Sequence, residues 1–285
     1  MKRHGRLPKG AGQEAGRAQS FNAAPDPPGG SATMGSPTDL HLHEQILLLA
    51  LRDRKGTPES GSGYARLAMG GAILAELALS GRVGVEEGRR ARVEVVGGAG
   101  LPGDEILAEA FALVGDRKRR QSAAEWVQTF SRLGSLQQRT ALGLCRRGIL
   151  RSTESRVLLV FNRKAYPTVD PGPETELVAR LREAVTGDGD VDPAVGVVVS
   201  LAYATDLLEI NLGRKLVRSR TRRIKDIVGG KRLAAGGRAA GPGREAVRTA
   251  VRAVQGAVID AVVATLDEEV ERTIEDLRRF GGRRF

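Results

Sequence analysis

The chain has 285 residues, of which 41% are hydrophobic but only 4% are Phe, Trp or Tyr, so its core must consist mainly of Leu, Val, Ile and Ala, a composition that favours helices. The single cysteine, Cys145, excludes an internal disulfide and a cysteine-rich metal site, and it fits a reducing compartment. The formal net charge of +11 indicates an anionic partner such as lipid headgroups, nucleic acid or a phosphorylated ligand, unless the arginines only cover a solvated surface.

The chain divides by composition into three parts. Residues 1–37 are basic, rich in Gly and Pro and poor in large apolar side chains, which predicts a disordered arm. They contain no apolar segment of a secretion signal, so we expect the protein to stay in the cytoplasm. A single helical domain is expected over residues 38–266, followed by a charged, frayed tail over residues 267–285.

Two apolar helices are predicted at the start of this domain. Thr38 is the expected N-cap of a helix from Asp39 to about Arg54. Residues 64–83 are apolar on almost every helical face, which predicts a helix in the centre of the core.

Three residues of this central helix restrict its surroundings. Gly70 and Gly71 are unfavourable inside a helix, so we expect them to let a neighbouring helix approach closely. The apolar run is shorter than the roughly 20 residues of a membrane span, and Glu76 lies within it. The pattern therefore predicts a core helix of a soluble domain.

The remaining segments predict a mainly α fold with apolar central helices, amphipathic outer helices and a β-hairpin. In chain order they are a short hairpin or extended excursion over 82–96, helices from 104, from 122 and over 134–147, a hairpin over 151–164, and helices over 174–185, 194–212, 214–228 and 244–266. In the second hairpin, residues 151–155 precede a second strand that is wholly apolar between Arg156 and Phe161. The helix over 194–212 is expected to pair with the central helix.

Two glycine- or aspartate-rich motifs resemble ligand sites but lack essential residues. Residues 98–103 match G-x-G-x-x-G, but Asp104 and Glu105 put negative charge where a dinucleotide pyrophosphate would bind. Residues 188–192 begin like a calcium loop, but Val199 occupies the twelfth position, where a bidentate Glu is required. We expect this second motif to cap a helix.

No metal, cofactor or catalytic site is expected. His41 and His43 are two residues apart and do not share a helical face, and His4 lies in the arm. Cys145 has apolar neighbours that favour burial rather than reactivity. The sequence therefore predicts a protein that is not an enzyme.

Cationic residues form two groups. The first surrounds the second hairpin and comprises Arg132, Arg139, Arg146, Arg147, Arg151, Arg156, Arg163 and Lys164. The second comprises Arg214, Arg218, Arg222 and Lys225 on one face of a helix, where a merely solvated surface is an equally good interpretation. For the first group, an apolar strand beside cations suits a membrane interface. The same order of helix, hairpin and basic tip is also typical of a winged-helix nucleic-acid-binding protein.

Four segments resemble the Golgi phosphoprotein 3 family, which includes the phosphatidylinositol 4-phosphate adaptor of the Golgi and many bacterial relatives. They are residues 42–56 (LHEQILLLALRDRKG), 75–82 (AELALSGR), 148–150 (GIL) and 201–209 (LAYATDLLE). The resemblance runs in the same order from about Leu40 to Ala264, and the Arg-, Ala- and Gly-rich composition resembles the actinobacterial members.

The resemblance implies one mostly helical domain that binds an acidic phosphoinositide headgroup peripherally, with a hairpin used in membrane insertion or self-association. In the eukaryotic adaptor, a tryptophan and an arginine near the start of the central helix, and two arginines in the helix before the hairpin, form the headgroup pocket. The aligned residues here are Gly61, Gly70, Gly134 and Gln137. None of them matches, which leaves the lipid species open.

We therefore expect a non-catalytic peripheral protein on the inner face of the membrane that binds anionic lipid, with phosphatidylinositol 4-phosphate as one candidate. The candidate headgroup contacts are Tyr64, Arg66, Arg132, Arg139, Arg156, Arg163 and Lys164. The candidates for membrane insertion or self-association are Leu158, Leu159 and Phe161. A winged-helix-like nucleic-acid-binding protein and a self-associating scaffold are the alternatives.

Overall fold

A computed structural model describes residues 40–51, 64–86, 88, 91–157, 161–234 and 244–281, without the side chains of 154–164, 244, 247 and 265–281. All of these residues belong to the larger of two units of the chain, Met34–Phe285. The helices are α1 (Leu42–Ala50), α2 (Ala65–Leu79), α3 (Glu105–Asp116), α4 (Ala123–Ser131), α5 (Leu136–Arg146), α6 (Gly172–Thr186), α7 (Pro193–Ala204), α8 (Leu207–Leu212), α9 (Arg214–Ser219), α10 (Thr221–Val228) and α11 (Arg244–Gly281). The strands are β1 (Val83–Val85), β2 (Val93–Val95), β3 (Thr153–Val157) and β4 (Phe161–Ala165), which form two separate antiparallel hairpins. The mainly α fold predicted from the sequence is confirmed.

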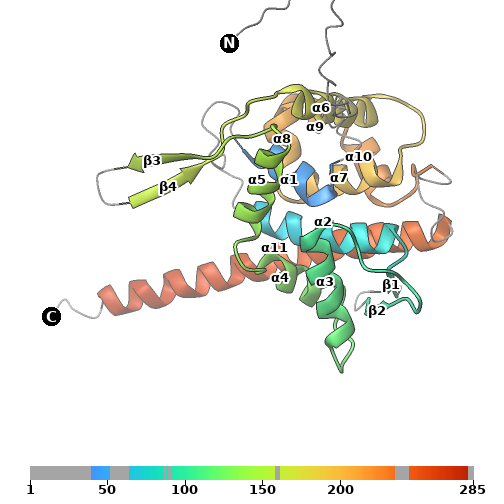
Figure 1. The fold of residues 1–285 in the computed structure, drawn as a ribbon, viewed down its shortest axis with the longest axis horizontal. Coiled ribbons are helices and arrows are strands. Elements are labelled where there is room, and N and C mark those ends of the chain that lie inside the picture. The colour runs from blue at the N-terminus through green and yellow to red at the C-terminus, as the bar shows by residue number, and fades with distance from the viewer. Residues whose placement is uncertain are drawn as a thin grey trace, which may run out of the picture. The chain divides into compact units, whose positions relative to one another are not determined.

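Helix α2 occupies the centre of the core, as its all-round apolar surface predicted. It packs against α1, α4, α7 and α11 (Figure 1). Gly71 permits two of these contacts, since a Cβ atom there would lie 2.5 Å from Cγ2 of Val258 in α11 and 2.9 Å from Cδ2 of Leu201 in α7. The close helix approach expected at this glycine is confirmed.

Side chains fix several helix starts at the predicted residues. Asp104 accepts a hydrogen bond from the backbone N–H of Leu107 (2.9 Å), and Asp192 accepts one from that of Ala194 (2.9 Å). Ser122 and Glu125 cap α4 reciprocally. These carboxylates and hydroxyls satisfy N–H groups that have no partner within the helix.

Three predicted helix limits were wrong. The first helix starts at Leu42 after the N-cap His41, not after Thr38. The predicted helix over 194–212 is divided into α7 and α8 by Asp206, whose φ of 61° is left-handed, a conformation that Asp tolerates better than most residues. The helix over 214–228 is similarly divided at Arg220 into α9 and α10.

The last helix is longer than predicted. The backbone of α11 remains helical to Gly281, beyond the limit predicted near Leu266. The buried positions of α11 include Val251, Val258 and Ala261, which pack into the same core as α2. Among the described residues, no helix combines the length and the apolar character that crossing a bilayer requires.

Candidate functional site

The start of α2 lies against the end of α4, near the positions where the family resemblance places a headgroup pocket. A Cβ atom on Gly70 would collide with the carbonyl oxygen of Val127 and lie 2.9 Å from the backbone nitrogen of Ser131. Any side chain at position 70 would therefore have to separate the two helices. Gly134, by contrast, is exposed, and a Cβ atom there would meet nothing within 4 Å. Position 70 therefore has no room for a side chain, whereas position 134 does. Gly61 lies outside the described residues.

Three candidate headgroup contacts border this junction. Tyr64 is the N-cap residue of α2 and is half-buried, whereas Arg66, in the first turn, is exposed. Arg132 is the exposed C-cap residue of α4. Because position 66 lies one helical turn before Gly70, Arg66 and Arg132 approach the same junction from two helices. The structure thus places two exposed arginines at the ends of the two helices that form this junction.

Arg139 in α5 is engaged by acids from α3. Its Nη1 lies 2.5 Å from Oε2 of Glu109, and its Nη2 lies 2.9 Å from Oε1 of Glu105. The hydrogen bond to Glu109 is the main reason why the pKa of Arg139 is raised. An incoming phosphate would have to displace two carboxylates from this guanidinium.

The second hairpin differs from its predicted register. Strand β3 ends at Val157, which pairs with Phe161 at the start of β4, so the apolar run spans the end of one strand and the beginning of the next. The prediction that the second strand is the apolar run was wrong, because residues 158–160 separate the strands without containing the Gly, Pro, Asn or Asp that normally indicates a turn.

The register also places the candidate cations of the hairpin. Arg156 pairs with Asn162, Arg163 pairs with Ser155, and Lys164 pairs with Glu154. Leu158 and Leu159 lie outside the described residues. The candidate cations are thus divided between β3 and β4, on both sides of the apolar segment in sequence.

Glu76, the acid in the central helix, binds the start of α1. Its Oε1 lies 2.5 Å from Nδ1 of His41, and its Oε2 accepts a hydrogen bond from the backbone N–H of Leu42 (2.8 Å). The hydrogen bond to Glu76 raises the pKa of His41 despite partial burial. Sequence reasoning missed this cap, although an acid inside an apolar helix indicates a buried polar partner.

His43 and Glu44 continue this polar cluster into the core. Burial lowers the pKa of His43 to about 4, and the nearest acid, Asp104, is 4.0 Å from its Nε2. Burial raises the pKa of Glu44, which nevertheless accepts hydrogen bonds from the backbone N–H of His41 (2.9 Å) and from Nη1 of Arg147 (3.0 Å). A second arginine near the hairpin is therefore committed to an internal acid.

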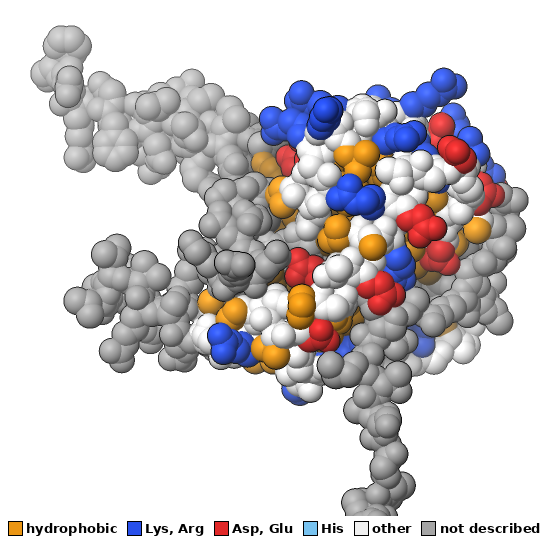
Figure 2. All heavy atoms as spheres, turned by 90° about the horizontal axis from the view of Figure 1, so that it is seen from above, with side chains coloured by type: hydrophobic (Ala, Val, Ile, Leu, Met, Phe, Trp, Pro, Cys, Tyr) orange, Lys and Arg blue, Asp and Glu red, His pale blue; other side chains and the backbone are white. Residues whose placement is uncertain are grey.

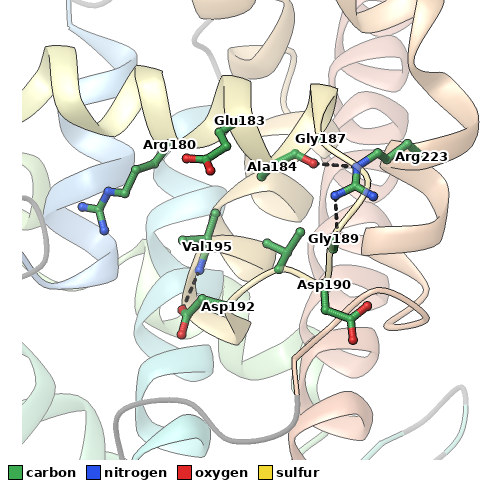
Figure 3. A pocket seen from close by; sticks show the side chains of 10 residues that line it. Arg180, Glu183, Ala184, Gly187, Gly189, Asp190, Asp192, Val195 and Arg223 are labelled. Atoms are coloured by element: carbon green, nitrogen blue, oxygen red, sulfur yellow. Dashed lines mark hydrogen bonds between the residues drawn. The ribbon is translucent and has the colours of Figure 1, made fainter.

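A cavity of about 230 Å³ lies between the end of α6 and the start of α7 (Figure 3). Arg223 reaches into the connecting turn, where its Nε donates to the carbonyl oxygen of Ala184 (2.8 Å) and its Nη2 donates to that of Gly189 (2.7 Å). Asp192, at the other end of the turn, caps α7. Arg223 and Asp192 therefore hold the turn in place from its two sides.

The chemistry of the one thiol is unfavourable for nucleophilic attack. Cys145 is half-buried, and burial raises the pKa of its thiol, whereas a reactive thiolate needs a lowered pKa. Within the described part of the chain, no three His, Cys, Asp or Glu side chains are grouped closely enough to hold a metal ion. The candidate binding surfaces described above, at the α2–α4 junction and on the β3–β4 hairpin, are instead cationic.

The sequence profile of a family described as Golgi phosphoprotein 3 (GPP34) matches residues 42–268. The chain belongs to this family. The chain is also similar to the vacuolar protein sorting-associated protein 74 of Eremothecium gossypii, to which it is 29% identical over 161 residues. That alignment covers 50% of this chain and 48% of the relative, so the chain aligns with about half the length of that protein.

The Golgi phosphoprotein 3 match coincides with the packed elements. It begins at Leu42, the first residue of α1, and ends within α11. Both hairpins and the α2–α4 junction therefore lie inside the family domain, whereas the last turns of α11 lie beyond the match. The family resemblance predicted from the sequence is confirmed.

Proposed function

We propose that this chain is a non-catalytic peripheral membrane protein that binds anionic lipid headgroups on the inner face of the membrane. The observation that carries the proposal is the Golgi phosphoprotein 3 match over residues 42–268, because resemblance to that family implies binding of an acidic phosphoinositide headgroup. The proposed contact surface comprises the α2–α4 junction and the β3–β4 hairpin, and phosphatidylinositol 4-phosphate is one candidate ligand.

Arg66 and Arg132 are the proposed phosphate contacts at the junction. Both side chains are exposed, and neither forms an ion pair with a described residue. A guanidinium group can bind two phosphate oxygens at once, so two such groups from different helices suit a phosphorylated headgroup. Tyr64 is proposed to line the same surface, and Arg139 to join it only if it leaves its carboxylates.

The hairpin is proposed to add insertion and general attraction. Burying a Leu or Phe side chain contributes about 1.5–3 kcal/mol, and each cation near an anionic surface contributes about 1 kcal/mol. Leu158, Leu159 and Phe161 are the proposed apolar insert, with Arg156, Arg163 and Lys164 beside it. Contributions of this size would give reversible membrane binding.

Vesicle flotation of the full chain tests this proposal. We expect flotation with phosphatidylcholine vesicles only when phosphatidylglycerol or phosphatidylinositol 4-phosphate is added. The Arg66→Gln/Arg132→Gln variant should bind these anionic vesicles about tenfold or more weakly than the unmodified chain. The matched control is Arg117→Gln/Lys118→Gln, which removes the same charge from exposed positions after α3. Equal flotation with neutral vesicles would contradict the proposal.

Self-association through the hairpin is a second candidate function. Each of β3 and β4 pairs only with the other among the described residues, which leaves two outer strand edges unpaired there. Such edges can pair with another copy of the chain. A mass that rises with protein concentration, and falls on Leu159→Asp, would support this role, whereas a constant monomeric mass would exclude it.

The winged-helix alternative is less well supported. It would use α5 for DNA contact, but Arg139 on that helix is paired with Glu105 and Glu109. These two carboxylates would repel the phosphates of a nucleic acid. We therefore propose lipid rather than nucleic acid as the anionic partner.

A further inference from the structure

Helices α9 and α10 carry a second cationic surface with an unusual concentration of charge. Residues 214–232 contain nine Lys and Arg residues but one acid, Asp226, in a chain whose formal net charge is +11. Eight of the nine are exposed and define what we call the basic face, namely Arg214, Lys215, Arg218, Arg220, Arg222, Lys225, Lys231 and Arg232. The ninth, Arg223, is turned toward the α6–α7 connection.

Most of the basic face is not neutralised within the described residues. Only two of its cations form ion pairs there, Arg214 with Glu209 (3.0 Å) and Lys231 with Asp226 (3.7 Å). Within α9, Arg214 and Arg218 lie four residues apart, and α10 adds Arg222 and Lys225. Like charges at this spacing weaken a helix slightly, so an anionic partner would relieve a repulsion that the fold leaves in place.

The opposite side of the two helices is fixed in the core. Val217, Ile224 and Ile227 are at most 1% exposed. The apolar side of the helices is therefore not available for insertion into a bilayer, and a contact through the basic face must be electrostatic. Figure 2 shows several Lys and Arg side chains along the upper edge of the face seen from above, with Asp and Glu side chains also present on that face, including near its upper right.

The composition of the segment argues against a single-stranded nucleic acid as the partner. Residues 204–234 contain no Phe, Tyr or Trp on which bases could stack. The exposed cations from Arg214 to Lys225 are carried by two consecutive short helices, α9 and α10. A row of exposed cations without an aromatic or apolar component matches the polybasic surfaces that bind anionic membranes.

We propose that the basic face is a second membrane contact, which binds the headgroups of an anionic bilayer by charge alone and does not discriminate among anionic lipids. This inference rests on the proposed function. It assigns the hairpin and the α2–α4 junction to insertion and headgroup recognition, and the basic face to general attraction. Two weak signals of different kinds are what a stable peripheral association requires.

Vesicle sedimentation with a charge-matched pair of variants tests the proposal. The test variant is Arg218→Gln/Arg222→Gln/Lys225→Gln, and the control is Arg117→Gln/Lys118→Gln/Arg119→Gln, which removes the same charge from exposed residues after α3. With vesicles of phosphatidylcholine and phosphatidylglycerol at low salt, we expect the test variant to lose roughly 100-fold in partition coefficient, at about 1 kcal/mol per cation, and the control to lose far less. The variant Arg218→Lys/Arg222→Lys should bind nearly as the unmodified chain does, because it keeps the charge.

The outcomes separate this inference from the proposed function. If the unmodified chain binds anionic vesicles but the test variant loses no more than the control, the basic face is not a membrane contact and the proposed function is unaffected. If the unmodified chain does not bind anionic vesicles, both proposals are wrong. Preferential binding of duplex DNA over vesicles, abolished in the test variant, would overturn the lipid assignment. Thermal unfolding of each variant checks that the fold is intact.

Discussion

The two cationic regions of this chain have nearly equal charge in the sequence but unequal availability in the structure. Residues 132–164 contain eight cations and one acid, and residues 214–232 contain nine cations and one acid. Two cations of each region form ion pairs within the described residues, but Arg139 and Arg147, bound by acids from α3 and α1, are only 26% and 31% exposed, whereas Arg214 and Lys231 of the basic face remain 70% and 72% exposed. Formal charge therefore does not measure the charge available to a partner, because neutralising acids come from segments distant in the sequence.

This difference suggests a division of roles. A guanidinium group held by carboxylates, such as that of Arg139 or Arg147, is oriented and occupied, which suits a structural role. Free guanidinium groups on a surface attract any polyanion and are sensitive to salt. We expect headgroup selectivity to depend on the α2–α4 junction, and the salt dependence of membrane binding to depend on the basic face.

The largest expected effect concerns the two glycines beside the first region. Gly70→Leu should lower the free energy of unfolding by more than about 3 kcal/mol, because its Cβ atom alone collides with the carbonyl oxygen of Val127. Gly134→Leu, at an open and exposed position, should change it by less than about 0.5 kcal/mol. Urea unfolding of both variants measures the contrast, and equal losses would show that the α2–α4 contact is not as close as described.

The second effect is the pH dependence of the free energy of unfolding that arises from the polar cluster of His41, His43 and Glu44, to which Arg147 is bound. The pKa of buried His43 is about 4, below its ordinary value of 6.5, so the unfolded state takes up more protons and stability falls as the pH drops from about 6.5 to about 4. The full loss from this residue is roughly 3 kcal/mol. The raised pKa values of His41 and Glu44 act in the opposite direction, since protonation of these groups favours the folded state.

Comparing the pH profile of stability of the unmodified chain with that of a His43→Leu variant isolates the contribution of this histidine. Urea unfolding at several pH values should show the unmodified chain losing more stability on acidification than the variant, with Glu76, Asp104 and His41 unchanged around the site. Parallel pH profiles would mean that His43 is not buried in its neutral form.

A smaller effect compares one arginine from each region. Arg147→Gln should lower the free energy of unfolding by about 1–2 kcal/mol, because it leaves the buried carboxylate of Glu44 with one fewer donor. Arg218→Gln should leave stability unchanged or raise it by about 0.3 kcal/mol, because it removes a like-charge repulsion. Thermal or urea unfolding distinguishes them, and a loss of similar size at both positions would remove the proposed difference between structural and available cations.

Local sequence signals predicted much of the fold. The apolar surface of residues 64–83, the capping residues Asp104 and Ser122, and the glycine pair within α2 each act through neighbours close in sequence or through a need for burial, which can be recognised without coordinates. The breaks at Asp206 and Arg220 could not be predicted, since neither residue is a strong helix breaker.

The candidate site was less predictable because its properties depend on distant partners. The ion pairs of Arg139 join residues 30 and 34 positions apart, and that between Arg147 and Glu44 joins residues 103 positions apart. The limits of β3 and β4 also carried no local signal, because residues 157–161 are apolar throughout. The placement of Tyr64, Arg66 and Arg132 beside one junction required the packing of α2 on α4.

The most direct test of the account is the partition of the full chain between solution and phosphatidylcholine vesicles, with and without phosphatidylglycerol, at low and high salt. The account predicts binding only to the anionic vesicles, a decrease at high salt, and a much weaker salt dependence in Arg218→Gln/Arg222→Gln/Lys225→Gln. Binding that is equal for neutral and anionic vesicles, or absent from both, would contradict it.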